Sequence, residues 1–192
     1  MDEAGGGGRR ALVVLAPGAE EMEAVIAVDV LRRAEVEVVL AGVHGPDPVT
    51  CSRGVRIVPD RPLAEVRQEP FDALVIPGGA AGAAALAASG EVCALVRACE
   101  ASGRLLGAIC AGPSVLVAAG AFAGRALTSH PVVRELLAAH GRYREEPVVR
   151  DGNLITSRGP GTAFAFALAL VEALCGAERA AAVAAPMMLP AG

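Results

Sequence analysis

The chain has 192 residues, of which 54% are hydrophobic and 20% charged, and a formal net charge of −4. This length supports one substantial hydrophobic core and is short for two, so we expect a single globular domain. The mildly acidic balance, without a broad basic surface, argues against specific binding of nucleic acid.

The five cysteines are scattered, odd in number and contain no CxxC pair, which argues against both a disulfide framework and a zinc site. Near the N-terminus, only six apolar residues follow an arginine pair before acidic residues appear, too few for a signal-peptide core. We therefore expect a reducing, intracellular compartment. The uncharged run at residues 105–124 is interrupted by four glycines and one proline, so it indicates a buried strand and a short helix rather than a membrane span.

Short runs rich in Leu and β-branched residues alternate with longer Ala-rich stretches of helical character. The runs predict strands at residues 11–16, 36–41, 72–76, 105–109, 127–128 and 154–156. The stretches predict helices at residues 20–34 and 91–101, directly after residue 110, and from about residues 131 and 161. Residues 55–58 and 148–149, the latter paired across 151–152, predict small hairpin additions. This βαβα order predicts a mostly parallel sheet covered by helices on both faces.

Chemically capable residues follow three of these strands, and open parallel sheets bind ligands beyond the carboxyl ends of their strands. Glu23 lies after the first strand, a Pro-Gly-Gly turn with Gly78 and Gly79 after the third, and Cys110 after the next. At a strand-to-helix turn, Cys110 would meet the first free N–H groups of a helix, which favour thiolate over thiol. His130 directly follows another predicted strand and is a candidate acid/base partner.

Each of these residues also has a purely structural interpretation. Cys110 alone could be a small buried hydrophobe, Glu23 a solvated helix carboxylate, and His130 the cap of the helix that follows. The glycine pair could form only a turn, but glycines also let backbone N–H groups approach a substrate oxygen. Taken together, they suggest an oxyanion hole completed by the Ala111 N–H, with Glu23 protonated in an apolar pocket and donating a hydrogen bond to sulfur.

Six segments, in order, make the chain resemble the parkinsonism-associated deglycase branch of the DJ-1/PfpI superfamily. They are APGAEEME at 16–23, DPVTCSR at 47–53, IPGG at 76–79, AICAGP at 108–113, SHP at 129–131 and TSRGPGT at 156–162. The resemblance covers residues 9–186 and implies one domain, with a flexible N-terminal tail at 1–8 and a C-terminal tail at 187–192. It implies a flavodoxin-like three-layer α/β sandwich of the class I glutamine amidotransferase type, with a mostly parallel central sheet.

The implied activity is hydrolytic and cysteine-dependent: removal of methylglyoxal and glyoxal adducts from proteins or nucleotides, releasing lactate or glycolate, in protection against oxidative stress. No metal or other cofactor is implied. The implied partners are a second copy of the chain, in a homodimer, and small dicarbonyls. The cytoplasm is the expected location, with the nucleus and mitochondrion open.

The resemblance also assigns roles to residues at matching positions. Cys110 corresponds to the nucleophile and oxidation-sensitive thiol, Glu23 to the protonated carboxyl and His130 to the acid/base. The anion-binding backbone corresponds to Gly78, Gly79 and Ala111, and the residues near the dimer interface to Asp29, Arg33 and Arg53, with Asp29 orienting His130 across subunits. Cys51 corresponds to a peripheral thiol open to modification.

The chain departs from the animal form of this family at two positions, and two other functions deserve comparison with the implied one. Val58 stands where the animal form has a further interface cysteine, and Ala80 stands where it has an asparagine beside the glycines. The same residues would also serve a redox sensor and redox-regulated chaperone, in which Cys110 is oxidised to a sulfinate. A glutamine amidotransferase or thiol protease would need a His-x-Glu pair, and no histidine here is followed by Glu two residues later.

Overall fold

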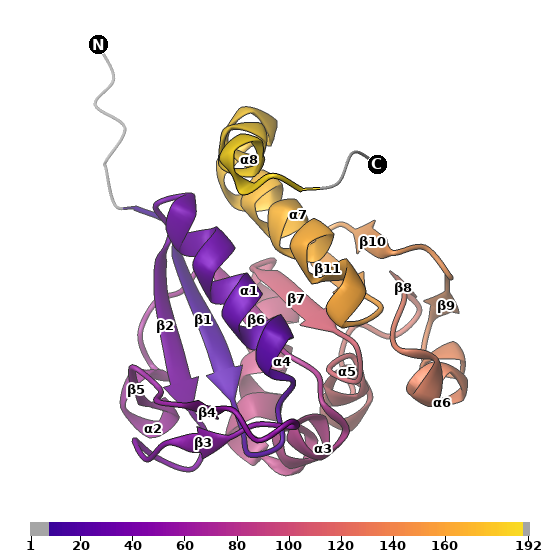
Figure 1. Cartoon of the computed structure of the whole chain (residues 1–192). Helices are drawn as coiled ribbons and strands as arrows, with labels where there is room; N and C mark the ends of the chain where they lie inside the picture. The colour runs from indigo at the N-terminus through magenta and orange to yellow at the C-terminus, as the bar shows by residue number, and fades with distance from the viewer. Residues whose placement is uncertain (1–7, 190–192) are drawn as a thin grey trace.

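A seven-stranded sheet forms the centre of the protein in the computed structural model, which describes residues 8–189 (Figure 1). The strand order is β10-β11-β7-β6-β1-β2-β5, and every neighbouring pair is parallel except β10 with β11. The strands are β1 (Arg10–Leu15), β2 (Glu37–Gly42), β5 (Arg61–Pro62), β6 (Ala73–Ile76), β7 (Leu105–Ile109), β10 (Val148–Asp151) and β11 (Leu154–Ser157).

Helices cover both faces of this sheet because the side chains of its strands alternate between two apolar cores. In β1, Val13 and Leu15 pack with one core, whereas Leu12 and Val14 pack with the other. The first core contains α1 (Glu21–Arg33), α7 (Ala163–Cys175) and α8 (Ala177–Ala184). The second contains α2 (Leu63–Val66), α4 (Gly90–Ser102) and α5 (Ser114–Ala119), together with buried leucines of α3 (Ala80–Ala88) and α6 (Arg134–Ala138). The architecture is the predicted flavodoxin-like three-layer sandwich.

Two small strand pairs lie outside the central sheet. The predicted hairpin around residues 55–58 is confirmed, since β3 (Val49–Thr50) pairs antiparallel with β4 (Arg56–Ile57). Within the central sheet, the predicted pairing across residues 151–152 is also confirmed, because β10 pairs antiparallel with β11. The strand predicted at 127–128 forms, as β8 (Ala126–Leu127), but it pairs with β9 (Arg142–Tyr143) rather than extending the central sheet.

Several helical features differ from the prediction. The helix α3 was not predicted, and Gly176, with φ of 92°, divides the C-terminal helical stretch into α7 and α8. The prediction of a helix directly after Cys110 was wrong, because tight turns occupy residues 110–113 and α5 begins only at Ser114. Short 3-10 helices complete the chain at Pro131–Val133, Pro160–Thr162 and Ala185–Met187. The predicted tails at 1–8 and 187–192 lie outside the described residues, apart from Gly8 and residues 187–189.

Over residues 8–189, no single helix has both the length and the apolar character needed to cross a membrane. The helices α3 and α4 meet that criterion only as a pair, and they are bent by 82° where they join.

Candidate active site

Cys110 stands at the carboxyl end of β7 in a backbone conformation that residues other than glycine rarely adopt. Its φ is +63°, in the left-handed region, where a Cβ atom crowds the backbone. Two backbone hydrogen bonds hold this conformation: the Cys110 N–H donates to the Ser157 carbonyl at 3.0 Å, and its carbonyl accepts from the His130 N–H at 2.8 Å. The fold therefore presents the thiol at a constrained turn, which is hydrogen-bonded to the end of β11 and to the segment that carries His130.

Glu23 approaches the thiol from the first turn of α1, where the Glu20 side chain caps the helix by accepting from the Glu23 N–H at 2.9 Å. The Glu23 side chain is only 1% exposed. Its Oε2 accepts the Gly78 N–H at 2.7 Å, and its Oε1 is buried without a hydrogen-bond partner among the described residues. The carboxyl is thus anchored through one oxygen, which leaves the other for the Cys110 thiol.

Gly78 separates the two reactive side chains and has no room for a side chain of its own. A Cβ atom there would lie 2.5 Å from the Cβ of Cys110 and 2.7 Å from Oε2 of Glu23. Its carbonyl also accepts the Glu20 N–H at 3.0 Å. The Gly78 N–H was expected in the anion-binding backbone, but because Glu23 occupies it, Gly78 instead positions the carboxyl.

Glu23 and Cys110 form a coupled pair in which burial disfavours negative charge. Burial, followed by the charge of Glu20, raises the pKa of Glu23 to about 7, although the Gly78 N–H and the nearby Cys110 thiol act against this rise. Burial, followed by the charge of Glu23, raises the pKa of Cys110 to about 12. Burial thus opposes the thiolate that the sequence led us to expect at Cys110, and near neutral pH the pair holds at least one proton.

Two backbone N–H groups have the opposite effect on the pKa of the Cys110 thiol. Those of Gly79 and Ala111 both lower the pKa of Cys110, although burial outweighs them. Gly79 directly precedes α3 with φ of 84°, and a Cβ atom there would collide with the Gly18 carbonyl oxygen. Donors that stabilise charge on sulfur are suited to stabilise an oxyanion formed next to it.

A cavity of about 330 Å³ opens over the thiol and is lined by half of the predicted site residues, though not by Glu23. It is lined by Glu20, Ser52, Arg53, Gly79, Ala80, Cys110, Ala111, His130, Val132 and Pro160. The imidazole of His130 is exposed, and its Nδ1 accepts the Val132 N–H at 3.2 Å, so the capping role is observed. An Nδ1 that accepts has no proton, so the neutral ring carries its proton on Nε2.

Glu21 shapes one wall of this cavity and was missed by the sequence reasoning. Its buried carboxylate accepts the Ser52 Oγ–H at 2.8 Å and the Arg53 N–H at 2.9 Å. The loop that carries Arg53 is thereby held against α1. The available signal was the run of acidic residues directly before an apolar helix, a position typical of capping and loop-anchoring carboxylates.

The remaining predicted residues lie away from the thiol. Asp29 and Arg33 form an ion pair of 2.6 Å one turn apart on α1, on its exposed surface. Cys51 is 5% exposed and its pKa is raised by burial and by the charges of Glu21 and Glu20. The expectation that Cys51 is a peripheral thiol open to modification is therefore corrected: in this chain the loop encloses it. In residues 8–189, no cluster of three or more His, Cys, Asp or Glu could hold a metal ion.

Comparisons with known proteins show the family of the chain. The model of the DJ-1/PfpI family matches residues 9–173. The chain is 50% identical over 185 residues to the Parkinson disease protein 7 homolog of Danio rerio, covering 95% of this chain and 98% of that protein. It is 43% identical over 183 residues to the glutathione-independent glyoxalase DJR-1.2 of Caenorhabditis elegans, covering 94% of this chain and 97% of that protein.

Among solved structures, the crystal structure of Drosophila melanogaster DJ-1beta superposes with a TM-score of 0.94 at 48% identity, covering 96% of this chain and all of that one. The family model and these full-length matches lead to one conclusion: the chain belongs to the DJ-1/PfpI family.

Proposed function

We propose that the protein is a cysteine-dependent glyoxalase and deglycase that acts on methylglyoxal, glyoxal and their adducts, with Cys110 as the nucleophile. The observation that carries the proposal is the meeting of three features on one cavity. They are the Cys110 thiol and the N–H groups of Gly79 and Ala111, which face the cavity, and the carboxyl of Glu23, which is buried beside the thiol. A relative of similar length is named a glutathione-independent glyoxalase, which supports this class of reaction.

The first step is attack of the sulfur of Cys110 on the aldehyde carbon of the dicarbonyl. Glu23, with a pKa of about 7, is partly ionised at neutral pH and receives the thiol proton as the C–S bond forms. The aldehyde oxygen gains negative charge and is stabilised by the Gly79 and Ala111 N–H groups. The raised pKa of the resting thiol is compatible with this step, because the proton leaves during attack and no stable thiolate is needed.

The second step is an internal rearrangement that needs no external oxidant. The oxyanion is protonated, and the hydrogen on the attacked carbon moves as a proton to the neighbouring carbonyl carbon through an enediol, oxidising one carbon and reducing the other. His130 lines the cavity and can relay this proton through Nδ1, its nitrogen without a proton, once that atom releases the Val132 N–H. Water then hydrolyses the thioester, which releases lactate, or glycolate when the substrate is glyoxal, and restores the Cys110 thiol. When the substrate is an adduct, the amine or thiol that carried the dicarbonyl is released in its free form.

The test is lactate formation from methylglyoxal by wild type, Cys110→Ala and Glu23→Gln. We expect Cys110→Ala to lose activity by at least about a thousandfold, as nucleophile removal does in other covalent enzymes. Glu23→Gln should lose about a hundredfold, the scale of one acid/base group. Cys175→Ala, which changes a thiol outside the cavity, serves as the control and should retain activity. Equal rates for Cys110→Ala and wild type would refute the assignment.

A second candidate role uses the same thiol as a redox sensor, and one observation favours it. Oε1 of Glu23 is buried without a partner among the described residues, so a protonated carboxyl could donate to an oxygen of a Cys110 sulfinate. Mild peroxide should then add two oxygen atoms to the Cys110 peptide in wild type and fewer in Glu23→Gln, as measured by mass spectrometry. Absence of the dioxidised peptide in wild type would remove this role.

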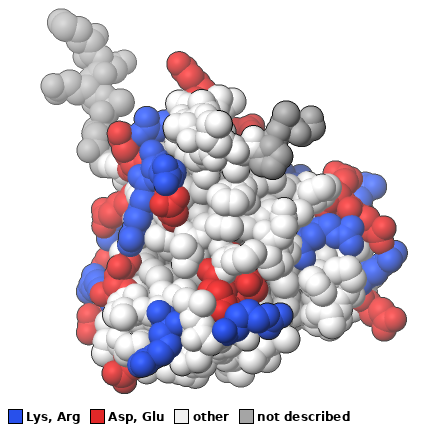
Figure 2. Space-filling view, in the orientation of Figure 1, with Lys and Arg blue, Asp and Glu red and all other residues white. Residues whose placement is uncertain are grey.

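The proposed assembly is a homodimer built on α1 and α7. Large hydrophobic side chains are exposed on both helices: Met22 is 49%, Val25 50% and Phe164 41% exposed. Figure 2 shows a broad, mostly uncharged area in the middle of the face on which α1 and α7 lie, with charged side chains gathered at its margins. Such a face is typical of a surface that is covered in the assembled protein.

A further inference from the structure

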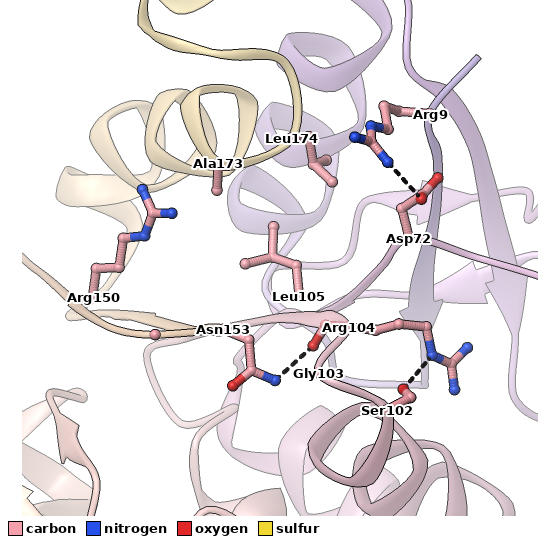
Figure 3. A pocket seen from close by; sticks show the side chains of 11 residues that line it. Arg9, Asp72, Ser102, Gly103, Arg104, Leu105, Arg150, Asn153, Ala173 and Leu174 are labelled. Carbon is pink, nitrogen blue, oxygen red and sulfur yellow. Dashed lines mark hydrogen bonds and ion pairs between the residues drawn. The ribbon is translucent and has the colours of Figure 1, made fainter. Parts of the chain in front are cut away.

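Figure 3 shows a second cavity, of about 370 Å³, from close by. It is lined by Arg9, Asp72, Ser102, Gly103, Arg104, Leu105, Arg150, Gly152, Asn153, Ala173 and Leu174. None of these residues lines the cavity over the thiol.

The topology places this cavity at the amino ends of the parallel strands. Arg9, Asp72, Arg104 and Asn153 directly precede β1, β6, β7 and β11 respectively. Leu105 begins β7, whose opposite end leads into Cys110. The two cavities therefore lie at opposite edges of the same sheet, and the proposed catalytic residues do not reach the second one.

Arginines dominate the charge of the second cavity. Arg9 donates to Asp72 at 3.1 Å, and the other oxygen of Asp72 accepts the Arg10 N–H at 2.8 Å. Arg104 donates from Nε to the Ser102 hydroxyl at 2.8 Å, and within residues 8–189 Arg150 has neither an ion pair nor a side-chain hydrogen bond. With one aspartate against three arginines, the cavity carries two uncompensated positive charges.

Apolar side chains occupy the space between these cations. Figure 3 shows Leu105, Ala173 and Leu174 between Arg150 on one side and Arg9 and Arg104 on the other. Leu105 is buried, whereas Ala173 and Leu174, near the end of α7, are half-buried. The lining thus combines an apolar floor with a cationic rim.

We propose that this cavity binds a small organic phosphate with a compact apolar body. A phosphate monoester carries between about 1.5 and 2 negative charges at neutral pH, which matches the charge left uncompensated by Asp72. Guanidinium groups bind phosphate oxygens through paired hydrogen bonds. Arg104 and Arg150 supply two guanidinium groups, so the phosphate can bind without disrupting the Arg9–Asp72 ion pair. The apolar body of the ligand rests on Leu105, Ala173 and Leu174. Ligand binding here is independent of the proposed chemistry at Cys110.

The experiment is isothermal titration calorimetry of the full chain with phenyl phosphate. Inorganic phosphate, which lacks the apolar body, and phenol, which lacks the charge, are the two comparison probes. We expect phenyl phosphate to bind more tightly than either, and Arg104→Gln or Arg150→Gln to weaken its binding by about five- to tenfold, the scale of one charged hydrogen bond. Ala173→Glu, which sets a carboxylate in the wall, should weaken it at least as much.

Two control variants locate the site. Arg144→Gln removes an exposed arginine outside both cavities and should leave the affinity unchanged. Arg53→Gln removes a cation from the cavity over the thiol and should also leave it unchanged. Loss of binding in Arg53→Gln with retention in Arg104→Gln and Arg150→Gln would overturn the proposal, as would inorganic phosphate binding as tightly as phenyl phosphate, or no binding of phenyl phosphate at all.

Discussion

Glu23 makes the folded state less stable as the pH rises. Burial raises its pKa from 4.5 to about 7, so the folded protein holds a proton on Glu23 that the unfolded chain has already lost. Between these two values the folded state binds more protons than the unfolded state, and the free energy of unfolding falls as the pH rises. A rise of this size predicts a loss on the order of 3 kcal/mol from this group between pH 4.5 and 7. Urea unfolding across this pH range measures it.

The variant Glu23→Gln isolates this contribution because its amide does not titrate. Its oxygen can still accept the Gly78 N–H, so the anchor of the side chain is retained. We expect the fall in unfolding free energy with pH to be much smaller in Glu23→Gln, and unchanged in Glu178→Gln, which alters an exposed glutamate on α8. A pH dependence identical in wild type and Glu23→Gln would contradict the buried-carboxyl interpretation.

Cys51 provides a second prediction at the scale of one residue. Because its thiol is enclosed and its pKa is raised by burial, iodoacetamide should alkylate it more slowly than the half-buried Cys175. Cys99, whose pKa burial raises to about 11, sets the reference for a fully protected thiol. Peptide mass spectrometry of the native protein over time gives the order, and alkylation of Cys51 at the rate of Cys175 would restore the expectation of a peripheral, modifiable thiol.

The sequence was informative about where the site residues lie and less so about their electrostatics. Cys110, Glu23 and the glycine pair each follow a strand of a parallel sheet, so their convergence could be predicted from topology. The protonation state of Cys110 could not, because it depends on how deeply the thiol is buried and how near Glu23 lies. Likewise, the role of the Gly78 N–H depends on which acceptor reaches it, a property of tertiary packing that spacing does not contain.

At the scale of elements, hydrophobic periodicity was enough to predict the main strands and helices α1 and α4 to within one or two residues. It failed for α3, which consists of Ala, Gly and one Leu and therefore has no apolar stripe to recognise. It also could not assign β8, since a two-residue strand has too few side chains to reveal its pairing partner. Both failures concern elements whose position is determined by tertiary packing.

Close packing of α3 on the first loop leads to the prediction for Gly82. A Cβ atom at Gly82 would lie 2.5 Å from both the N and Cα atoms of Ala19, and backbone atoms cannot move aside as a side chain can. Although alanine is the better helix former, Gly82→Ala should lower the free energy of unfolding by about 1–3 kcal/mol through overpacking. Urea denaturation of the purified variant measures the loss.

Gly90 is the matched control because it begins α4 and a Cβ atom added there would meet no other atom within 4 Å. There Gly90→Ala should be neutral or stabilising by up to about 1 kcal/mol, since it reduces only the freedom of the unfolded chain. If Gly82→Ala were as stable as Gly90→Ala, α3 would not be packed against the loop before α1 as described.

At the scale of the whole molecule, the sheet separates two surfaces with different chemistry. Its carboxyl edge carries the thiol cavity, enclosed by the loops before α1 and α3. Its amino edge carries the arginine-lined cavity, which ends on α7. The buried strand β7 runs from Leu105, in the arginine-lined cavity, to the residue before Cys110. Because the two cavities lie at opposite ends of this strand, a substitution in one cavity should leave the other unchanged.

The exposed apolar face of α1 and α7 supports the last prediction, which concerns assembly. Met22 and Val25 are three residues apart and so share one face of α1. In a symmetric dimer the same surface is used by both copies, so a single substitution acts twice. Val25→Asp would place two carboxylates in the proposed contact and should convert the proposed dimer to a monomer, as measured by light scattering after gel filtration. Leu136→Asp, on the exposed face of α6, is the control and should remain dimeric. A wild-type monomer, or a Val25→Asp variant that stays dimeric, would show that α1 does not form the contact.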